Sequence, residues 1–181
     1  MTISFEIPTK PAGQPRARVG VIGGHGRAFK SKKAHALEAD VLAFAAPVAP
    51  DVRLEGAVSV TVEARIAVPD SWADWRREAA LAGAIRPTSR PDADNVAKLI
   101  LDAINRSGRF WRDDAQVVEL RARKVYASAP ATRVTIASVE EVEGAAAWKA
   151  IKAKHLGPAI AWIPAAASST LHEANLFGGP A

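Results

Sequence analysis

Residues 56–69, GAVSVTVEARIAVP, alternate strictly between apolar and polar side chains. In an extended chain Val58, Val60 and Val62 point to one side, and Ser59 and Thr61 point to the other. The apolar side continues through Ala64, Ile66 and Val68. This period of two predicts a half-buried strand, the clearest in the chain. Such a strand needs partner strands and an apolar layer over its buried face, which other segments of the chain must supply.

Two amphipathic helices are predicted to supply the layer. The first runs over about residues 32–46, begins at the cap residue Ser31, and places Leu37, Val41 and Phe44 on one face. The second runs from about residue 94 to residue 105 and has an apolar stripe at helical spacing. That stripe consists of Val96, Leu99, Ile100, Ala103 and Ile104.

The other predicted elements complete a mixed α+β fold, with a small mostly antiparallel or mixed sheet and packed helices. ISFEIP (residues 3–8) is a first strand, and the Gly-, Pro- and Arg-rich residues 11–30 form an irregular or hairpin segment. Residues 115–127 and 132–142 are two strands that we expect to be adjacent, joined by a turn. A short helix is expected over residues 71–83, with Ser71 opening a capping box and Gly83 ending the helix. Its Trp72, Trp75 and Ala79 share one face, which favours packing over base stacking.

Composition narrows the class of protein. The chain of 181 residues is long enough for one good core, and no apolar run reaches the roughly 18 residues of a membrane helix. We see no signal peptide at the N-terminus, and the absence of cysteine is compatible with a reducing cytoplasm. The four histidines show no zinc spacing. We divide the chain into a domain over residues 1–142 and an Ala- and Pro-rich extension over residues 143–181, partly helical or loose.

The net charge of +5 is concentrated near the N-terminus. Residues 1–33 hold seven Lys and Arg against one acid, Glu6. Such a segment suits a polyanion such as nucleic acid, and it equally suits a solvated surface. If it binds nucleic acid, we expect the contacts from Arg16, Arg18, Lys30 and Lys32.

Against this basic background, the stretch RPDADNVAKLILDAINRSGRFWRDDAQV, residues 90–117, gathers five of the chain's nineteen acids. Asp92 and Asp94 lie at the start of the second helix, where one aspartate serves as a cap and two exceed that need. Asp113 and Asp114 follow the helix stop at Gly108, where a turn would also explain them.

Chain geometry allows these groups to meet. A helix of about 12 residues carries the chain roughly 18 Å, and the next eight residues span about 26 Å when extended. The chain can therefore return Asp114 to the helix start, beside Asp92 and Asp94. Three converging carboxylates repel one another unless a cation joins them, and Mg²⁺ prefers oxygen ligands. Lys98, one turn after Asp94, either forms an ion pair along the helix or stabilises charge on a phosphoryl group.

The pattern Pro-Asp-x-Asp-Asn-x-x-Lys, then Asp-Ala, then Trp-x-Asp-Asp-x-Gln-Val closely resembles the RusA family of Holliday junction resolvases, which are bacterial and phage endodeoxyribonucleases. The resemblance is strongest over residues 90–126 and covers about residues 1–142. It implies that Asp92, Asp94 and Asp114 hold Mg²⁺ and that Lys98 assists catalysis. It also implies a homodimer, because a four-way junction has approximate two-fold symmetry and resolution needs two symmetric nicks. Asp113 matches a family aspartate of less defined role, and Asn95 is expected to support the turn.

Three hypotheses follow. The first is a Mg²⁺-dependent endonuclease that resolves DNA junctions in the cytoplasm. The second is a nucleic-acid-binding accessory protein whose aspartates are caps, and the third is a nuclease of flaps, forks or other branched DNA. The full set of Asp92, Asp94, Lys98 and Asp114 favours an enzyme, since a pure binding protein gains nothing from three carboxylates beside DNA phosphates.

Overall fold

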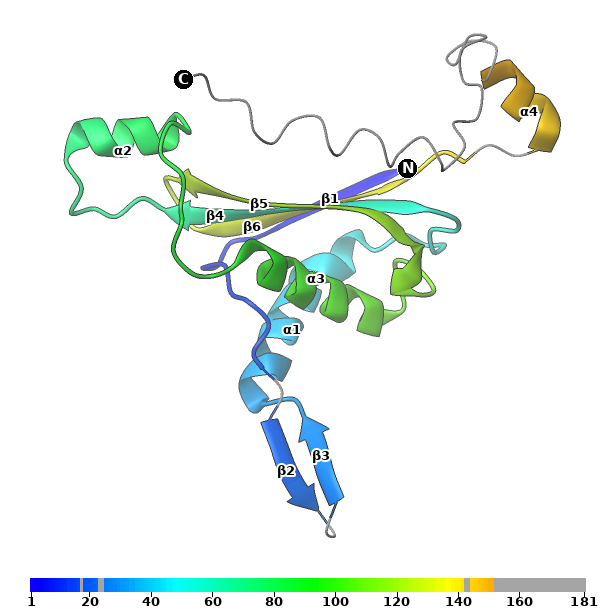
Figure 1. The fold of residues 1–181 in the computed structure, drawn as a ribbon, viewed down its shortest axis with the longest axis horizontal. Helices are drawn as coiled ribbons and strands as arrows, with labels where there is room; N and C mark the ends of the chain where they lie inside the picture. The colour runs from blue at the N-terminus through cyan, green and yellow to red at the C-terminus, as the bar shows by residue number, and fades with distance from the viewer. Residues whose placement is uncertain (17, 23–24, 142–143, 152–181) are drawn as a thin grey trace, which may run out of the picture. The chain divides into compact units, whose positions relative to one another are not determined.

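The computed structural model describes residues 1–16, 18–22, 25–141 and 144–151, with the side chains of residues 18–22, 26–28, 147 and 151 left undescribed. The chain divides into two units, Met1–Glu140 and Glu141–Ala181. The first unit has the expected mixed α+β fold, with a four-stranded sheet and helices packed against it (Figure 1).

Four strands form the main sheet, in the order β1-β6-β4-β5. They are β1 (Thr2–Ile7), β4 (Val58–Ala67), β5 (Val117–Ala127) and β6 (Ala131–Ser138). β6 pairs antiparallel with both β1 and β4, whereas β4 and β5 are parallel, so the sheet is mixed. The long connection that a parallel pair requires carries two of the helices, α2 (Asp74–Leu81) and α3 (Ala93–Ser107).

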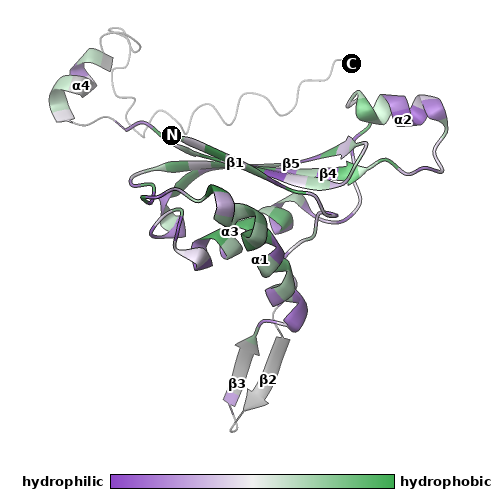
Figure 2. Ribbon diagram, turned by 180° about the vertical axis from the view of Figure 1, so that it is seen from behind, coloured by the Kyte–Doolittle hydropathy of each residue, from purple (hydrophilic) through white to green (hydrophobic). Residues whose placement is uncertain are grey.

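The two longer helices cover one face of this sheet. Helices α1 (Lys32–Ala45) and α3 lie on the same side of the strands (Figure 1), and the apolar residues of α3 line its inner side (Figure 2). The predicted cap of α1 and the predicted end of α3 are confirmed. The Ser31 hydroxyl accepts a hydrogen bond from the backbone N–H of Ala34, and Gly108 ends α3 with a φ of 60°. The core between the layers is built from Ile3, Phe5, Val41, Val58, Val60, Val62, Val96, Leu99, Ile100, Ala103, Ile104, Phe110, Trp111, Val134 and Ile136.

The opposite face of the sheet carries a row of alternating charges. In register across the strands stand Glu6, Arg133, Glu63 and Arg123. Glu63 is paired with Arg65 and with Arg123, and Glu6 is paired with Arg65 and Arg133. These pairs explain why Glu63 is buried although its strand position faces away from the helices.

Smaller elements complete the chain. β2 (Arg18–Ile22) and β3 (His25–Phe29) pair with each other in a separate two-stranded sheet, which confirms the hairpin expected within residues 11–30. Two short 3₁₀ helices, η1 (Ala46–Val48) and η2 (Asp114–Gln116), follow α1 and precede β5. The second unit contributes α4 (Gly144–Ile151). No helix in the described part of the chain has the length and apolar character needed to cross a membrane.

Two expectations about the sheet and α1 were wrong. β5 and β6 are not adjacent, because β4 lies between them. β4 is the strand with the most complete buried face and therefore takes a central position. On α1, Phe44 is exposed, and the buried stripe runs instead through Ala34, Glu38, Val41 and Ala45. That stripe keeps helical spacing but contains a carboxylate, so hydrophobicity alone does not find it.

Expectations about α2 also need correction. The helix begins at Asp74 with Ala73 as its cap residue and without a side-chain cap, because residues 69–72 form a turn of their own. Ser71 therefore does not cap the helix. Trp72 packs edge-to-face against Tyr126, as expected of a packing residue, but Trp75 is 69% exposed.

Candidate active site

The start of α3 presents two free carboxylates. Asp92 is the cap residue of the helix, yet its side chain makes no capping hydrogen bond, and Asp94 lies in the first turn. Both side chains are exposed, and within the described residues neither forms an ion pair. Helix capping therefore does not account for either aspartate. Their oxygens remain available for a ligand brought from outside, which suits a hard cation in chemistry.

The second pair of aspartates separates into two roles. Asp113 caps η2: its carboxylate accepts the backbone N–H of Ala115 at 2.9 Å, and Gln116 completes a capping box. Gln116 also ties this turn to the segment before β4 by donating to the carbonyl oxygens of Leu54 and Gly56. Asp114 is exposed and has no ion pair among the described residues. The turn explanation thus fits Asp113 and leaves Asp114 free.

One chain does not bring Asp114 back to the start of α3. Asp114 lies just before β5, whereas Lys124, near the end of β5, donates to the carbonyl oxygen of Ser89 at 2.7 Å, three residues before Asp92. The strand between Val117 and Lys124 rises about 3.3 Å per residue, so these two ends lie roughly 23 Å apart. Accordingly, no three acidic or histidine side chains among the described residues gather closely enough to hold a metal ion. The expectation that a single chain closes the site was wrong. That expectation takes residues 107–114 back along the helix, whereas Phe110 and Trp111 of this segment are buried in the core.

Lys98 stands one turn along α3 from Asp94. Its side chain is 64% exposed, and its Nζ lies 3.7 Å from Asp102 Oδ1, an i,i+4 ion pair. At that distance and exposure the ion pair contributes little to the stability of the fold, about 0.3–0.5 kcal/mol. The ammonium group therefore remains able to leave Asp102 for a phosphate.

The residues predicted to bind DNA have different surroundings. Arg16 and Lys32 are exposed and have no ion pair among the described residues, whereas the side chain of Arg18 lies outside the described residues. Lys30 is engaged, since its Nζ donates to Glu38 Oε1 at 2.6 Å.

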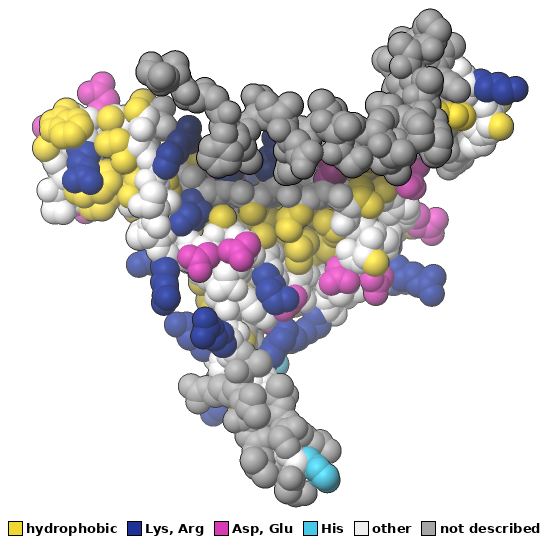
Figure 3. Space-filling view, viewed as in Figure 1, with side chains coloured by type: hydrophobic (Ala, Val, Ile, Leu, Met, Phe, Trp, Pro, Cys, Tyr) yellow, Lys and Arg dark blue, Asp and Glu magenta, His cyan; other side chains and the backbone are white. Residues whose placement is uncertain are grey.

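The chain before β2 approaches α3 closely: the Gln14 backbone N–H donates to the Asn95 carbonyl at 3.0 Å, and a Cβ on Gly13 would lie 2.6 Å from Asn95 Nδ2. In Figure 3, basic side chains border the acidic ones on the face that carries α3.

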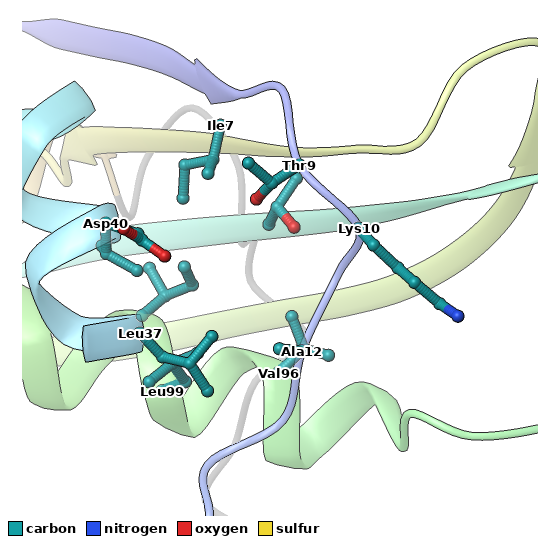
Figure 4. A pocket seen from close by; sticks show the side chains of 11 residues that line it. Ile7, Thr9, Lys10, Ala12, Leu37, Asp40, Val96 and Leu99 are labelled. Carbon is teal, nitrogen blue, oxygen red and sulfur yellow. The ribbon is translucent and has the colours of Figure 1, made fainter. Parts of the chain in front are cut away.

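A small pocket elsewhere on the molecule lacks the chemistry of this site. It lies between the end of β1, α1 and α3, and Asp40 is its one acidic lining residue (Figure 4). Most of the other lining side chains are aliphatic, among them Ile7, Leu37 and Leu99, and Lys10 points away from them in the view of Figure 4. The free aspartates lie on the open surface instead, where a substrate as large as duplex DNA has access.

Glu38, a carboxylate in α1, is not among the residues predicted from the sequence, and its side chain is only 2% exposed. Burial by itself raises the pKa of Glu38, but hydrogen bonds from Lys30 and Gln14 and the charges of Lys30 and Arg106 outweigh it, so the pKa lies below its usual value. Arg106 Nη1 lies 2.6 Å from Glu38 Oε2 as an ion pair without hydrogen-bond geometry. The signal in the sequence is the helical spacing of Ala34, Glu38 and Val41, which places the acid on the buried stripe.

The lowered pKa of Glu38 predicts a pH dependence of stability. Because the folded-state pKa lies below the ordinary value of 4.5, ionised Glu38 stabilises the fold above that pH, and the contribution is lost as the pH falls through the folded value. Glu38→Gln should therefore be less stable than wild type at pH 7, with the difference shrinking below about pH 4.5. Urea unfolding over a pH series measures this. Glu55→Gln, an exposed acid without an ion pair among the described residues, is the control. A difference from wild type that is independent of pH would contradict the prediction.

Comparison with known proteins shows the family to which this chain belongs. The model of the family Endodeoxyribonuclease RusA matches residues 8–137, from the end of β1 into β6, and so includes both ends of α3 and η2. A Bacillus subtilis (strain 168) protein, named "Uncharacterized protein YqaN", is 31% identical over 139 residues, which are 76% of this chain and 96% of that protein. The family resemblance seen in the aspartate motifs is confirmed: this chain belongs to the RusA family of endodeoxyribonucleases, hydrolases that act on DNA and resolve Holliday junctions.

Proposed function

We propose that this protein is a Mg²⁺-dependent, structure-selective endodeoxyribonuclease that resolves Holliday junctions by paired phosphodiester hydrolysis. The observation that carries the proposal is the pair of exposed carboxylates at the start of α3, Asp92 and Asp94, which neither cap the helix nor form ion pairs within the described residues. Family membership and the basic segment beside α3 support DNA as the substrate.

Asp92, Asp94 and Asp114 are the residues that would hold the metal ion. Free carboxylate oxygens are the donors that Mg²⁺ prefers, and no thiolate or histidine cluster among the described residues competes for a softer metal. A bound Mg²⁺ supplies activation of water and neutralisation of phosphate charge. The protein's own residues do the rest: they fix the cation's position relative to α3 and bind the DNA backbone.

Lys98 is proposed to stabilise negative charge that develops on the scissile phosphate. It stands on the same helix as Asp94, one turn further on, and its ammonium group is mostly exposed. A fixed cation at this point acts most strongly in the transition state, where the phosphate charge increases. The basic groups of Arg16, Arg18 and Lys32 would hold the DNA beside it.

A homodimer would complete the site. Within one chain Asp114 lies at the opposite end of β5 from the segment that leads into Asp92, so a second copy in reversed orientation is needed to bring the groups together. β5 is an edge strand, and its Val118 and Leu120 are 60% and 50% exposed close to Asp114. An exposed apolar edge of this kind supports pairing with another chain. Two-fold symmetry would then give two sites, as paired incision requires.

The first test is cleavage of labelled four-way junctions and linear duplex, with and without Mg²⁺. Wild type should cut the junction in the presence of Mg²⁺ and leave linear duplex intact. Asp92→Asn and Asp94→Asn should each abolish cutting while junction binding persists, because the basic surface is unchanged. Near wild-type rates in both variants would contradict the site, and equal cutting of flaps or forks would assign the enzyme to other branched DNA.

Subunit mixing tests the dimer. Asp94→Asn and Asp114→Asn should each be inactive alone, whereas a mixed dimer keeps one complete site if each site draws on both chains. Random mixing then restores about a quarter of the sites and yields nicked rather than resolved junctions. Gel filtration checks that each variant alone forms dimers. A mixture that stays inactive although mixed dimers form would show that the aspartates of each site belong to one chain.

Replacing Lys98 with methionine distinguishes catalysis from a simple ion pair with Asp102. A catalytic role predicts unchanged folding and junction affinity, with a single-turnover rate about a hundredfold lower that added Mg²⁺ does not restore. Lys149→Met, which removes an exposed positive charge from α4, should keep the wild-type rate. A Lys98→Met rate within about threefold of wild type would leave Lys98 with the ion-pair role only.

A further inference from the structure

The two chain segments that lead into and out of the β2–β3 hairpin converge on one buried carboxylate. Gln14, before β2, donates from Nε2 to Glu38 Oε1 at 3.2 Å. Lys30, directly after β3, donates from Nζ to the same oxygen at 2.6 Å. The other oxygen of Glu38 faces Arg106 of α3 at 2.6 Å. Glu38 therefore joins both ends of the hairpin to α1 and α3.

A second carboxylate, Asp102 of α3, also contacts Gln14 and Lys30, and in addition lies near Lys98. Gln14 Nε2 also donates to Asp102 Oδ2 at 2.9 Å, and Lys30 Nζ lies 3.7 Å from that oxygen. The remaining oxygen, Oδ1, lies 3.7 Å from Lys98 Nζ. Asp102 is thus shared between the base of the hairpin and the lysine proposed to act in catalysis.

These contacts matter because, in the part of the chain that the structure describes, β2 and β3 pair only with each other. An isolated two-stranded hairpin is marginally stable in water. A buried carboxylate is costly unless it is paired, so Glu38 tolerates only arrangements in which its cations stay in place. The requirement to keep Glu38 paired therefore restricts the positions open to Gln14 and Lys30.

We propose that Glu38, with Asp102, is a positioning residue that holds the base of the β2–β3 hairpin against α1 and α3, so that the hairpin and Lys98 face the same stretch of DNA backbone. The proposal rests on the proposed function in taking DNA as the ligand. It assigns Lys30 to this anchor rather than to a phosphate contact. Arg16, which follows Gln14 closely in the chain, is then held beside α3.

Replacing one acid by its amide distinguishes a positioning role from a purely electrostatic one, because the two roles predict opposite changes in DNA affinity. A protein that loses a negative charge should bind DNA more tightly if charge alone matters. If Glu38 positions the hairpin, Glu38→Gln should weaken binding although the protein becomes more positive. Glu6→Gln is the matched control: it removes the same charge from an acid paired with Arg65 and Arg133 on the opposite face of the sheet.

Junction affinity and single-turnover cleavage are measured for wild type, Glu38→Gln, Asp102→Asn and Glu6→Gln at one salt concentration. We expect Glu6→Gln to bind as tightly as wild type or more tightly, and Glu38→Gln to bind at least tenfold more weakly, with most of its loss in affinity rather than in the rate at saturation. Asp102→Asn should lose both affinity and rate, because Asp102 also contacts Lys98. If Glu38→Gln binds as tightly as Glu6→Gln, the proposal is overturned.

A second measurement needs no DNA and so separates this proposal from the proposed function. Because the chain contains no cysteine, a pair of spin labels can be attached at two introduced cysteines, replacing exposed His25 at the start of β3 and exposed Asp51 of the first unit. Dilution with unlabelled protein restricts the readout to distances within one chain. The distribution should be narrow with Glu38 present and broad in Glu38→Gln, and an unchanged narrow distribution would overturn the anchor.

The two experiments still test the proposal if Glu38→Gln does not fold or if the protein does not bind junctions. Should Glu38→Gln not fold, Asp102→Asn carries the test, because the Asp102 side chain is 26% exposed and its loss disturbs the core less. Asp102→Asn should then broaden the label distances, and wild-type distances in that variant would overturn the proposal. If wild type neither binds nor cuts junctions, the proposed function fails, whereas the label distances still decide whether Glu38 positions the hairpin.

Discussion

The packing of α3 against the four-stranded sheet determines where every candidate catalytic group stands. The helix buries Ile100 and Ile104 almost completely against a layer that includes Val60 and Val62 of β4. A close-packed interface of this kind resists small shifts, so the helix start and the chain beyond its end are held at a fixed separation. The aspartates lie outside this core, but their positions are set by it.

Acidic residues perform three different tasks in this chain, and the surroundings of each carboxylate determine its task. Asp113 caps a 3₁₀ helix, and Glu38 and Glu63 are buried between cations that lower their pKa values against the opposing effect of burial. Asp92, Asp94 and Asp114 are exposed and lack such partners within the described residues. A buried acid without partners would be unstable, whereas an exposed one costs little and stays available to a cation. Glu55 is also exposed and lacks such partners, so Asp92, Asp94 and Asp114 are distinguished by their positions in the family motif rather than by exposure alone.

The basic excess and the free aspartates Asp92, Asp94 and Asp114 are complementary. A polyanionic substrate is attracted by Lys and Arg over a wide surface, while the proposed hydrolysis of its phosphodiester bond would use a metal cation at one point. Glu38 and Asp102 have a different role, because their ion pairs hold Lys30, Arg106 and Lys98 in defined positions. The net positive charge of the chain thus includes cations that organise the surface and cations that are free for DNA.

Elements that depend on local periodicity and on short motifs could be predicted from the amino-acid sequence. The alternation of residues 58–64 predicted β4, the helical stripe and Gly108 predicted α3, and the spacing of Asp92, Asp94, Lys98 and Asp114 indicated the family. Four other features follow from the folded chain: the insertion of β4 between β5 and β6, the burial of Glu38, the exposure of Trp75, and the separation of Asp114 from Asp92 within one chain. The physical reason is that these features depend on contacts between residues far apart in the chain, such as Gln14 with Asp102 or Gln116 with Leu54, and no local pattern encodes such contacts.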